Sequence, residues 1–586
     1  MTLTPYAHSI STRVARRPLL GLALATVTAA AAQAQNVARP NAAMPEATQG
    51  QAAIDALGAR LVDVAFENGM STSFLIEQFR TDDSLRVDTN DRLFHVDPAA
   101  LSEREREDPG PSGSGLDNIP LSSAFLLHSN PGADHTIYLD FTGHHSVNNS
   151  WGHNIMFPNY NDDGGAGSFT NSELFDIIVY WQHIAEDFEP FDNVDVTTEE
   201  PPLDRLQKTG GGDNQWGVRC LFTQPTSGFG SGIGGVAYLN SFDDSIDNPV
   251  FCFNKGRKTG AMTGSHEVGH ALGLSHDGLN SQSYHPGTGS GATSWGPIMG
   301  APFGASLVQW SIGDYAGSTN TQNDVNVITK SANGLTVKAD DHSDVVGSGT
   351  FMDVGCPAAE VAVTGIIETR NDLDTFEFVS LGGNYRFIVD HAPVHRNLDI
   401  QLQIFDDLGV LVHTENGTRD PDVDVTLALE PGSYSAQVDG VGKTGFYSDY
   451  GTLGAYTITI RPLNGFLDLG NSLAGTKAVA LTGQGFACPG DTVSLDMKLG
   501  LPNTIAFLAY GRGTANIPFK GGLIVPNTAL GGTRTVITDG QGKASVAGPW
   551  PPGVPSGFEF TFQYWQPDPF GPQGWAATNA VKLTAP

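Results

Sequence analysis

One fifteen-residue stretch restricts the local fold of this chain more than any other segment. Residues 264–278 read GSHEVGHALGLSHDG. On a helix, His266 and His270 are four residues apart and therefore project from the same face. Gly273 allows the chain to leave the helix through backbone angles that other residues avoid, which can bring His276 back to the same two imidazoles. The stretch thus predicts a helix, a tight exit at glycine and a cluster of three histidines.

Three convergent imidazoles are typical of a metal site, and the pattern indicates a reactive site rather than a structural one. Three protein ligands leave a fourth position for water, whereas structural zinc sites use four protein ligands. Glu267 follows the first histidine and is expected beside the metal rather than on it. The spacing therefore predicts Zn²⁺ bound by His266, His270 and His276, with Glu267 as the general base that takes a proton from metal-bound water.

The same residues resemble the metzincin metallopeptidases, whose zinc motif HExxHxxGxxH is followed by a Met-turn. Met299, within WGPIMG at 295–300, stands where the Met-turn methionine is expected, and Asp277 follows His276 as in reprolysin-like members. The likeness is greatest to secreted bacterial peptidases of that type and covers residues 119–332. It implies a zinc endopeptidase that acts on proteins or peptides, with an α/β (α+β) catalytic domain on a mixed five-stranded sheet.

The resemblance also implies where a substrate would lie. Residues 236–242 would form an antiparallel edge strand above the cleft, to which an extended peptide adds by main-chain hydrogen bonds; its site residues are Val236, Ala237, Tyr238 and Leu239. Residues 300–303 would form a wall of the pocket for the side chain that follows the cut bond. Astacin and serralysin members have a metal-approaching tyrosine where this chain has Ala301. Tyr284 could approach the site instead, but we do not expect it to.

Local patterns support an α/β layer structure in this part of the chain. Thr170 and Glu173 have the capping-box spacing, and apolar residues recur at three and four up to Phe188, which predicts a long helix ended by Pro190. Strands are predicted at 136–141, 216–223, 236–242 and 249–253. There are four cysteines. Because the implied metzincin sheet puts Cys220 and Cys252 in neighbouring strands, whereas Cys356 and Cys488 lie in different β blocks, a disulfide between the first two is the more expected.

The N-terminal region predicts export. Three arginines precede an apolar run from Leu19 to Ala32 and an Ala-Gln-Ala site, so residues 1–34 are interpreted as a signal peptide. The protein is therefore expected to be secreted or to reach the outer cell surface. No later apolar run is long enough for a membrane span.

Residues 35–118 contain helical patterns at 52–66 and 71–80, a hairpin pattern at 85–96 and a Gly/Pro/Ser-rich linker at 102–116. The region is either a pro-segment or a permanent small α+β module. No cysteine precedes Cys220, so a thiolate from this region cannot fill the open metal position, although an acid or a steric plug could. Cleavage in the linker would then release it.

Beyond residue 337 the pattern predicts strands only, in two all-β sandwich-like domains at 333–463 and 464–586. The first resembles the bacterial pre-peptidase C-terminal domain through DLDTFEF (372–378), NLDIQLQIFD (397–406) and residues 445–460. That resemblance implies an accessory module for surface or substrate association, and Ca²⁺ could bind acids such as Asp340, Asp341 and Asp374. The second block resembles no family that we can name.

Charge and composition limit the partners. Sixty-three acidic residues against thirty-one basic ones give a net charge of -32, which disfavours nucleic acid, and we expect a monomer. His144, His145, His153 and His285 are expected to be exposed in loops, and the acidic turns at 161–164 and 243–244 either bind calcium or are simply solvated.

The rival function is a secreted or cell-surface binding or adhesive protein with a vestigial zincin domain, because about half of the mature chain is β modules. A further alternative is hydrolysis of a non-peptide amide. An intact Glu267 favours an enzyme.

Overall fold

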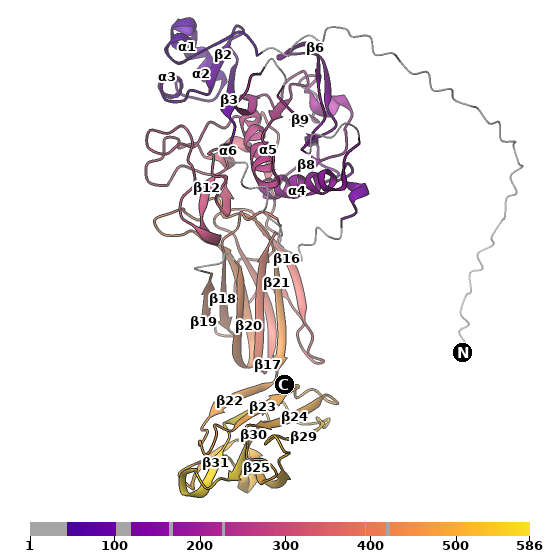
Figure 1. Cartoon of the computed structure of the whole chain (residues 1–586), viewed down its shortest axis with the longest axis vertical. Coiled ribbons are helices and arrows are strands. Elements are labelled where there is room, and N and C mark those ends of the chain that lie inside the picture. The colour runs from indigo at the N-terminus through magenta and orange to yellow at the C-terminus, as the bar shows by residue number, and fades with distance from the viewer. Residues whose placement is uncertain are drawn as a thin grey trace, which may run out of the picture. The chain divides into compact units, whose positions relative to one another are not determined.

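The structure is a computed structural model that describes residues 44–100, 119–162, 168–225, 229–392, 394–417 and 422–585 (Figure 1). The predicted signal peptide and the linker at 102–116 lie outside these ranges. Separate hydrophobic cores form in four successive parts of the chain: the N-terminal unit, residues 44–100; the α/β domain, residues 119–332; the β-sandwich, residues 333–463; and the C-terminal β domain, residues 464–585. The protein is thus multidomain and mostly β.

The N-terminal unit folds as three helices and three strands. Gly58 has a positive φ of 53° and interrupts the first predicted helix, which therefore forms two pieces. Ser71 caps the third helix by accepting a hydrogen bond from the backbone N–H of Phe74. The elements are α1 (Gly50–Leu57), α2 (Leu61–Glu67), α3 (Thr72–Thr81), β1 (Ala47–Gln49), β2 (Leu85–Asp88) and β3 (Leu93–Pro98). The predicted hairpin is confirmed, because β2 and β3 pair antiparallel.

The central sheet has eight strands in the order β1-β2-β3-β10-β11-β9-β4-β8. Residues 119–332 supply five of them: β4 (His135–Asp140), β8 (Val194–Thr197), β9 (Gly217–Phe222), β10 (Ile233–Tyr238) and β11 (Val250–Cys252). These five form a mixed sheet, since β10 is antiparallel to β11 while β8, β4, β9 and β11 run parallel. The other three strands come from the N-terminal unit and continue the sheet beyond β10, which the sequence did not predict.

Two long helices, α4 (Asn171–Asp187) and α5 (Arg257–Leu272), pack against each other and on the sheet. The capping box of Thr170 and Glu173 is present at the start of α4. The other face of the sheet is covered by the hairpin β5 (His144–Asn149) and β6 (Gly152–Phe157), whose Trp151, Ile155 and Phe157 join a core with Phe251. The remaining elements of this domain are β7 (Phe191–Asp192), β12 (Trp295–Pro297), β13 (Leu307–Gln309) and α6 (Asp324–Ile328).

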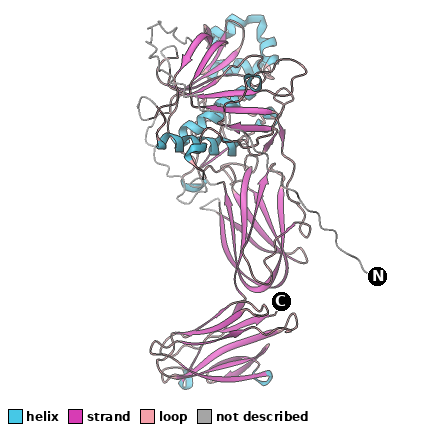
Figure 2. Cartoon of the chain, turned by 90° about the vertical axis from the view of Figure 1, so that its right-hand side faces the viewer, coloured by secondary structure: helices cyan, strands magenta, loops and turns pink. Residues whose placement is uncertain are grey.

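Among the described residues, the last α-helix ends at Ile328, and beyond it lie strands, loops and two short 3-10 helices, η7 (Thr528–Leu530) and η8 (Pro572–Gly574) (Figure 2). Two strands of the β-sandwich are long, with 19 and 18 residues: β17 (Leu373–His391) and β20 (Val423–Gly440). These two pair antiparallel along most of their length. The other strands of the sandwich are β15 (Thr350–Phe351), β16 (Val361–Ile367), β18 (Ile400–Asp406), β19 (Leu411–Asn416) and β21 (Gly454–Asn464), whereas β14 (Thr336–Val337) pairs antiparallel with β7 of the α/β domain.

The C-terminal β domain has its own core, which includes Phe466, Leu508, Tyr564 and Leu583. Its strands are β22 (Phe466–Gly470), β23 (Ala480–Gln484), β24 (Thr492–Lys498), β25 (Ile505–Arg512), β26 (Thr514–Phe519), β27 (Gly522–Pro526), β28 (Gly531–Ile537), β29 (Ala544–Pro549), β30 (Glu559–Pro567), β31 (Trp575–Ala577) and β32 (Ala580–Thr584). No described helix has both the length and the apolar character needed to cross a bilayer.

The predicted disulfide is wrong. Cys220 and Cys252 do lie in neighbouring strands with their sulfurs 3.5 Å apart, but they are free thiols, and Cys356 pairs with Cys488 instead. In the parallel register Cys220 faces Val250, so the two cysteines are offset by two residues. Leu381 and Phe486 bring the β-sandwich and the C-terminal β domain together around Cys488. The bridge therefore connects two β domains that the sequence treats as separate.

The thiol pattern is open to a direct test. Under non-reducing conditions, the native protein is expected to resist alkylation because both free thiols are buried. After unfolding without reductant, exactly two cysteines should be labelled, and peptide mapping should identify them as Cys220 and Cys252. Label on Cys356 or Cys488 before reduction would contradict the pairing.

Candidate metal centre

The helix α5 is built to pack closely and to end at a fixed point. A Cβ at Gly264 would meet Ile184 and Phe222, and a Cβ at Gly269 would meet Met299, so both glycines are needed for the helix to pack as it does. Gly273 has φ of 107° and caps the helix in the left-handed conformation. A side chain at this position would also overlap Asn240 and Lys330. The predicted exit at glycine is thus confirmed.

The exit brings the three histidines together. His270 Nε2 and His276 Nε2 are 3.0 Å apart, and the three ring centroids are 4.7 to 5.1 Å from one another. All three side chains are buried. Each Nδ1 is within hydrogen-bond distance of an oxygen: Ile298 O at 2.9 Å for His266, Leu274 O at 2.7 Å for His270, and Asp82 Oδ2 at 2.7 Å for His276. These contacts fix the rings with Nε2 pointing inward.

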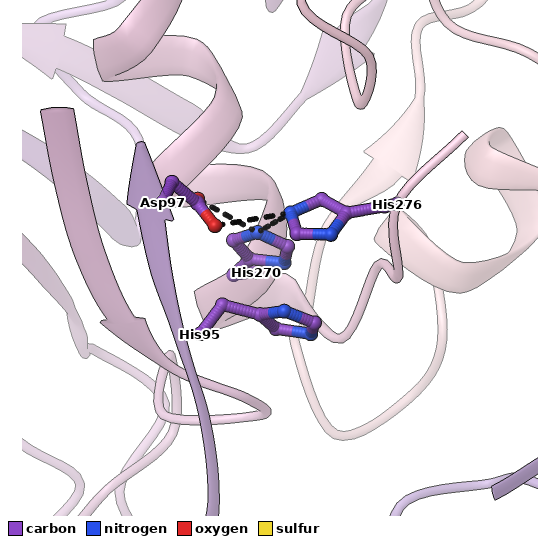
Figure 3. A group of neighbouring side chains, drawn as sticks. All are labelled: His95, Asp97, His270 and His276. Atoms are coloured by element: carbon purple, nitrogen blue, oxygen red, sulfur yellow. Dashed lines mark hydrogen bonds and ion pairs between the residues drawn. The ribbon is translucent and has the colours of Figure 1, made fainter. Parts of the chain in front are cut away.

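A carboxylate from the N-terminal unit completes the group. Asp97 Oδ2 lies 3.2 Å from His266 Nε2 and 3.5 Å from His270 Nε2, and Asp97 Oδ1 lies 3.3 Å from His276 Nε2. Figure 3 shows Asp97 on β3 pointing toward His270 and His276. The centre therefore has a carboxylate whose oxygens lie 3.2 to 3.5 Å from three Nε2 atoms, and two of these nitrogens, those of His270 and His276, are 3.0 Å apart.

The electrostatics of this group favour a cation. If every Nδ1 donates to its oxygen, the Nε2 lone pairs all face one another and the carboxylate, and no donor remains between them. His266 Nε2 and Asp97 Oδ2 indeed lack a hydrogen-bond partner. Burial disfavours the charged imidazolium of His276, but the carboxylates of Asp82 and Asp97 outweigh it and raise its pKa to about 10. A bound metal ion would also neutralise the carboxylates of Asp82 and Asp97, so the residues fit a metal ion.

Glu267 lies beside this centre rather than in it. Its side chain is fully buried, and neither carboxylate oxygen has a hydrogen-bond partner. A Cβ at Gly235 on β10 would overlap the carboxylate, so glycine at that position makes room for it. Burial and the charge of Asp97 raise the pKa of Glu267 well above its usual range.

Met299 and Asp277 lie beneath the histidines. Met299 is fully buried against Gly269, and its carbonyl accepts a hydrogen bond from the N–H of Asp277. This contact connects the loop that carries His276 to the turn at 295–300. Tyr284 was not expected to approach the centre, but it does. Its hydroxyl donates to Asp97 Oδ1 at 2.8 Å, and its ring centroid lies 4.2 Å from that of His276.

A cavity opens next to His266 and Glu267. Gly300, Ala301, Pro302 and Phe303 line it, as the sequence predicted for the pocket wall. Other lining residues are Met262, Thr263, Ile298, Gly235 and Asn254. The lining is mainly apolar.

The strand predicted to run above the cleft is β10, and it begins earlier and ends earlier than predicted. It spans Ile233–Tyr238, so Val236, Ala237 and Tyr238 are within it, whereas Leu239 follows it. Among the five strands of the α/β domain, β10 is an edge strand, as predicted. The edge of β10 that does not pair with β11 pairs antiparallel with β3 of the N-terminal unit.

Sequence analysis missed three residues near the centre, all from the N-terminal unit: Asp82, His95 and Asp97. His95 stacks on His270 with ring centroids 4.1 Å apart and its Nδ1 is 2.9 Å from Ser84 Oγ. The only local signal was the alternation of β3, which puts residues 95 and 97 on one face of the strand.

A second buried group, His183, Asp187 and His395, also brings possible ligand atoms together. Its two rings are stacked, with centroids 3.5 Å apart and an angle of 18° between the planes. Rings that share one metal ion must converge on it, as the first group does with centroids 4.7 to 5.1 Å apart. The stacked pair does not have that geometry.

The β-sandwich brings some of its acids together. Asp340, Glu368 and Asp372 form a group, and Asp374 is close enough to raise the pKa of Glu368 through its charge. Glu368 is 2% exposed and neither of its carboxylate oxygens has a partner. Burial and the charge of neighbouring Asp372 raise the pKa of Glu368 to about 10. A cation would relieve this repulsion, and oxygen ligands suit calcium.

Calcium is accordingly predicted to stabilise the β-sandwich. Millimolar Ca²⁺ should raise the melting temperature of the wild-type protein, and Glu368→Gln should abolish that increase while leaving zinc content unchanged. Glu360→Gln, an exposed acid that pairs with Arg461, is the matched control. An equal increase in all three proteins would contradict the assignment.

The other polar candidates have structural roles or lie partly outside the described residues. His285 is 2% exposed, contrary to expectation, and its Nδ1 accepts a hydrogen bond from Gly287 N–H. Asp243 Oδ2 pairs with Lys208 and Asp244 Oδ2 pairs with Arg92, so each carboxylate already has a cationic partner. Of the turn at 161–164, residues 163 and 164 are outside the described ranges.

Comparisons with known proteins give only weak likenesses. No family model matches the chain, and no curated protein matches it. Among solved structures, the pre-peptidase C-terminal domain of collagenase from Bacillus anthracis is 11% identical, covers 19% of this chain and 93% of that chain, and has a TM-score of 0.15. Tripeptidyl peptidase 2 is 9% identical and has a TM-score of 0.13; the match covers 43% of this chain and 24% of that chain. At these scores the likenesses carry no argument about function.

Proposed function

We propose that this protein is an exported zinc endopeptidase of the metzincin type that hydrolyses peptide bonds in proteins or peptides. The observation that carries the proposal is the convergence of three Nε2 atoms beside the unpartnered carboxylate of Glu267. Zinc–nitrogen bonds of about 2.0 to 2.1 Å in a tetrahedron give ligand–ligand distances of roughly 3.3 to 3.4 Å. His270 Nε2 and His276 Nε2 are 3.0 Å apart, and the Asp97 oxygens are 3.2 to 3.5 Å from the three Nε2 atoms, which is consistent with zinc.

The chain's own residues have distinct tasks in the proposed reaction. His266, His270 and His276 would hold the zinc, which when bound polarises a carbonyl and acidifies a water molecule. Glu267 accepts the proton of the attacking water and later donates a proton to the leaving amine. Gly235 leaves the space in which the Glu267 carboxylate lies. Met299 supports the helix below the histidines.

Substrate binding is proposed along β10 and in the adjoining cavity. The main chain of β10 can add an extended peptide as a strand, as it does with β3. Met262, Ile298, Pro302 and Phe303 make the cavity apolar, so it should accept an apolar side chain next to the cut bond.

The rival function, binding or adhesion by a protein with a vestigial centre, is less well supported. A buried carboxylate without partners is costly, and a site kept only for structure has no need of Glu267. Hydrolysis of a non-peptide amide would use the same residues and would differ only in the pocket.

Metal analysis and a peptide library test the proposal together. Full-length protein from residue 35 is expected to contain one zinc per chain. Protein starting at residue 119 should cleave an unbiased peptide library, with apolar residues enriched after the cut bond, and a chelator should abolish this cleavage until zinc is restored. The full-length form should be less active. Absence of zinc after reconstitution, or cleavage that survives the chelator, would overturn the proposal.

A further inference from the structure

We propose that the β-sandwich is a fixed support of the metal centre, and that Asn397 of the sandwich positions the proposed ligand His266 through the residues that lie between them. The inference rests on the proposed function and concerns the geometry of the same centre. It gives the sandwich a role other than the surface or substrate association that its resemblance implies. Three sets of contacts carry it: those of β13, those of α4 and α5, and those of the segment that joins the two domains.

The turn that forms the pocket wall also orients a histidine. Ile298 O is 2.9 Å from Nδ1 of His266, and Ile298 lines the cavity beside Glu267. This turn follows β12, which pairs parallel with β13, and Ile298 N–H donates to the main-chain oxygen of Gln309 in β13 at 2.9 Å. A carbonyl that holds the outer nitrogen of a ligating histidine fixes the orientation of its ring. The position of β13 therefore affects both His266 and the cavity.

The β-sandwich contacts the edge of β13 that β12 leaves free. Val308 N–H donates to Arg396 O at 3.2 Å, in the segment between β17 and β18. The side-chain amide of Gln309 is buried and joins both neighbours, because its Nε2 donates to Asn397 O and its Oε1 accepts from Trp295 Nε1 at 2.7 Å. Residues of the sandwich thus extend the small sheet of β12 and β13.

An aromatic stack adds apolar contact at the same place. The ring of Tyr447, between β20 and β21, lies 5.7 Å from that of Trp295 in β12, with an angle of 19° between the planes. These two residues form a small core with Leu307 of β13. The Tyr447 hydroxyl donates to Asp399 Oδ2 at 2.6 Å, so the sandwich itself holds the ring in this position.

A second route runs from Asn397 to α5. Its Nδ2 donates to Asp187 Oδ1 at 3.0 Å, and Ser265 Oγ donates to Asp187 Oδ2. Asp187 is the last residue of α4, and Ser265 directly precedes His266 on α5. All of these side chains are buried, and a buried carboxylate depends on such donors. Asn397 therefore reaches His266 by its main chain through Gln309 and by its side chain through Asp187.

The segment that joins the two domains is itself paired with the α/β domain. β14 pairs antiparallel with β7, and Lys338 N–H donates to Pro190 O at 3.0 Å. On the sandwich side, the Tyr450 hydroxyl donates to Asn323 Oδ1 at 2.8 Å and accepts from Val325 N–H at 3.0 Å. Domains on flexible linkers move independently, whereas contacts of this kind hold the sandwich against β13 and α4.

The test uses the chain that starts at residue 35, with Co²⁺ in place of zinc. The visible absorption of Co²⁺ reports the geometry of its ligands and does not depend on activity. Asn397→Asp keeps the size of the side chain but places a second carboxylate against Asp187. We expect a changed Co²⁺ spectrum, measured well below the melting temperature, and a zinc affinity about 3- to 10-fold lower in competition with a chelator. This loss is smaller than for a direct partner of a ligand, because Asn397 is one contact further from the metal.

Two substitutions of Tyr447 isolate the stack. Both Tyr447→Phe and Tyr447→Ala lose the hydrogen bond to Asp399, but only the alanine variant loses the ring on Trp295. Tyr447→Phe should therefore keep the wild-type spectrum and zinc affinity, whereas Tyr447→Ala should change both. Leu429→Ala is the control for stability, because Leu429 is buried in the sandwich core in the middle of β20. It should lower the melting temperature and leave the spectrum unchanged.

The outcomes separate this inference from the proposed function. A wild-type spectrum and wild-type zinc affinity in both Asn397→Asp and Tyr447→Ala overturn the support while leaving a zinc peptidase. An equal change in Leu429→Ala or in Tyr447→Phe overturns it as well, because the effect then comes from general destabilisation. If Asn397→Asp does not fold, the two Tyr447 variants decide. Absence of any metal from the wild-type chain overturns the proposed function and this inference with it.

Discussion

Glu267→Ala is expected to keep zinc and to lose about 10²- to 10⁴-fold in turnover, the typical contribution of general acid–base catalysis. The substitution removes the proposed base but none of the metal ligands. Glu267 makes no hydrogen bond that other residues depend on, so its loss should not disturb the three histidines. Turnover is measured on protein starting at residue 119, and zinc content on both forms.

Glu267→Gln provides the matched control for this prediction. The amide has nearly the same shape, so it leaves no cavity, but it cannot accept the proton of the attacking water. Both variants should therefore be similarly impaired in turnover, and any difference between their melting temperatures should come from the cavity that alanine leaves. Peptidase activity that is unchanged in either variant would reject Glu267 as the base.

The histidine cluster was predictable because its information is local. His266, His270, Gly273 and His276 lie within eleven positions, and the helix period and the glycine exit suffice to bring them together. The capping box of α4 and the hairpin of β2 and β3 were predictable for the same reason. Each depends on a spacing of only a few residues.

The carboxylates at the centre were not predictable in this way. Asp82 and His276 are 194 positions apart, and no spacing in the sequence relates them. They meet because β3 adds to β10, and an edge strand accepts any extended segment with little regard to its side chains. The sequence reasoning left an acid from the N-terminal region as one alternative, but only the strand register selects Asp97.

The wrong disulfide has a related cause. Neighbouring strands bring Cys220 and Cys252 close, but the register decides which residues oppose each other, and periodicity does not determine register. Cys356 and Cys488 lie in separate cores, and their contact depends on how two β domains meet. Tyr284 was misjudged in the same manner, since its partner Asp97 comes from another domain.

His276→Ala is expected to lower zinc affinity at least about 100-fold, because loss of even an outer partner of a ligand costs 10- to 100-fold. His276 is the proposed ligand that enters from the loop after Gly273, so its removal leaves α5 and the other two histidines in place. The variant should fold, since the side chain contributes to the centre rather than to the principal apolar core.

Thermal unfolding of the full chain gives the readout for this last prediction. Zinc at 100 times its dissociation constant adds about 2.7 kcal/mol to the free energy of unfolding when it binds only the folded state. Wild-type protein stripped of metal should therefore melt at a higher temperature when zinc is added. In His276→Ala a 100-fold weaker affinity leaves the same zinc concentration near the dissociation constant, so the stabilisation should fall to about 0.4 kcal/mol or less. His285→Ala is the matched control, because His285 is buried nine residues further along the same segment but contacts Trp295 and Tyr315 instead of the centre. Whatever its melting temperature without metal, its gain with zinc should equal that of the wild type. An equal gain in His276→Ala would remove that residue from the ligand set.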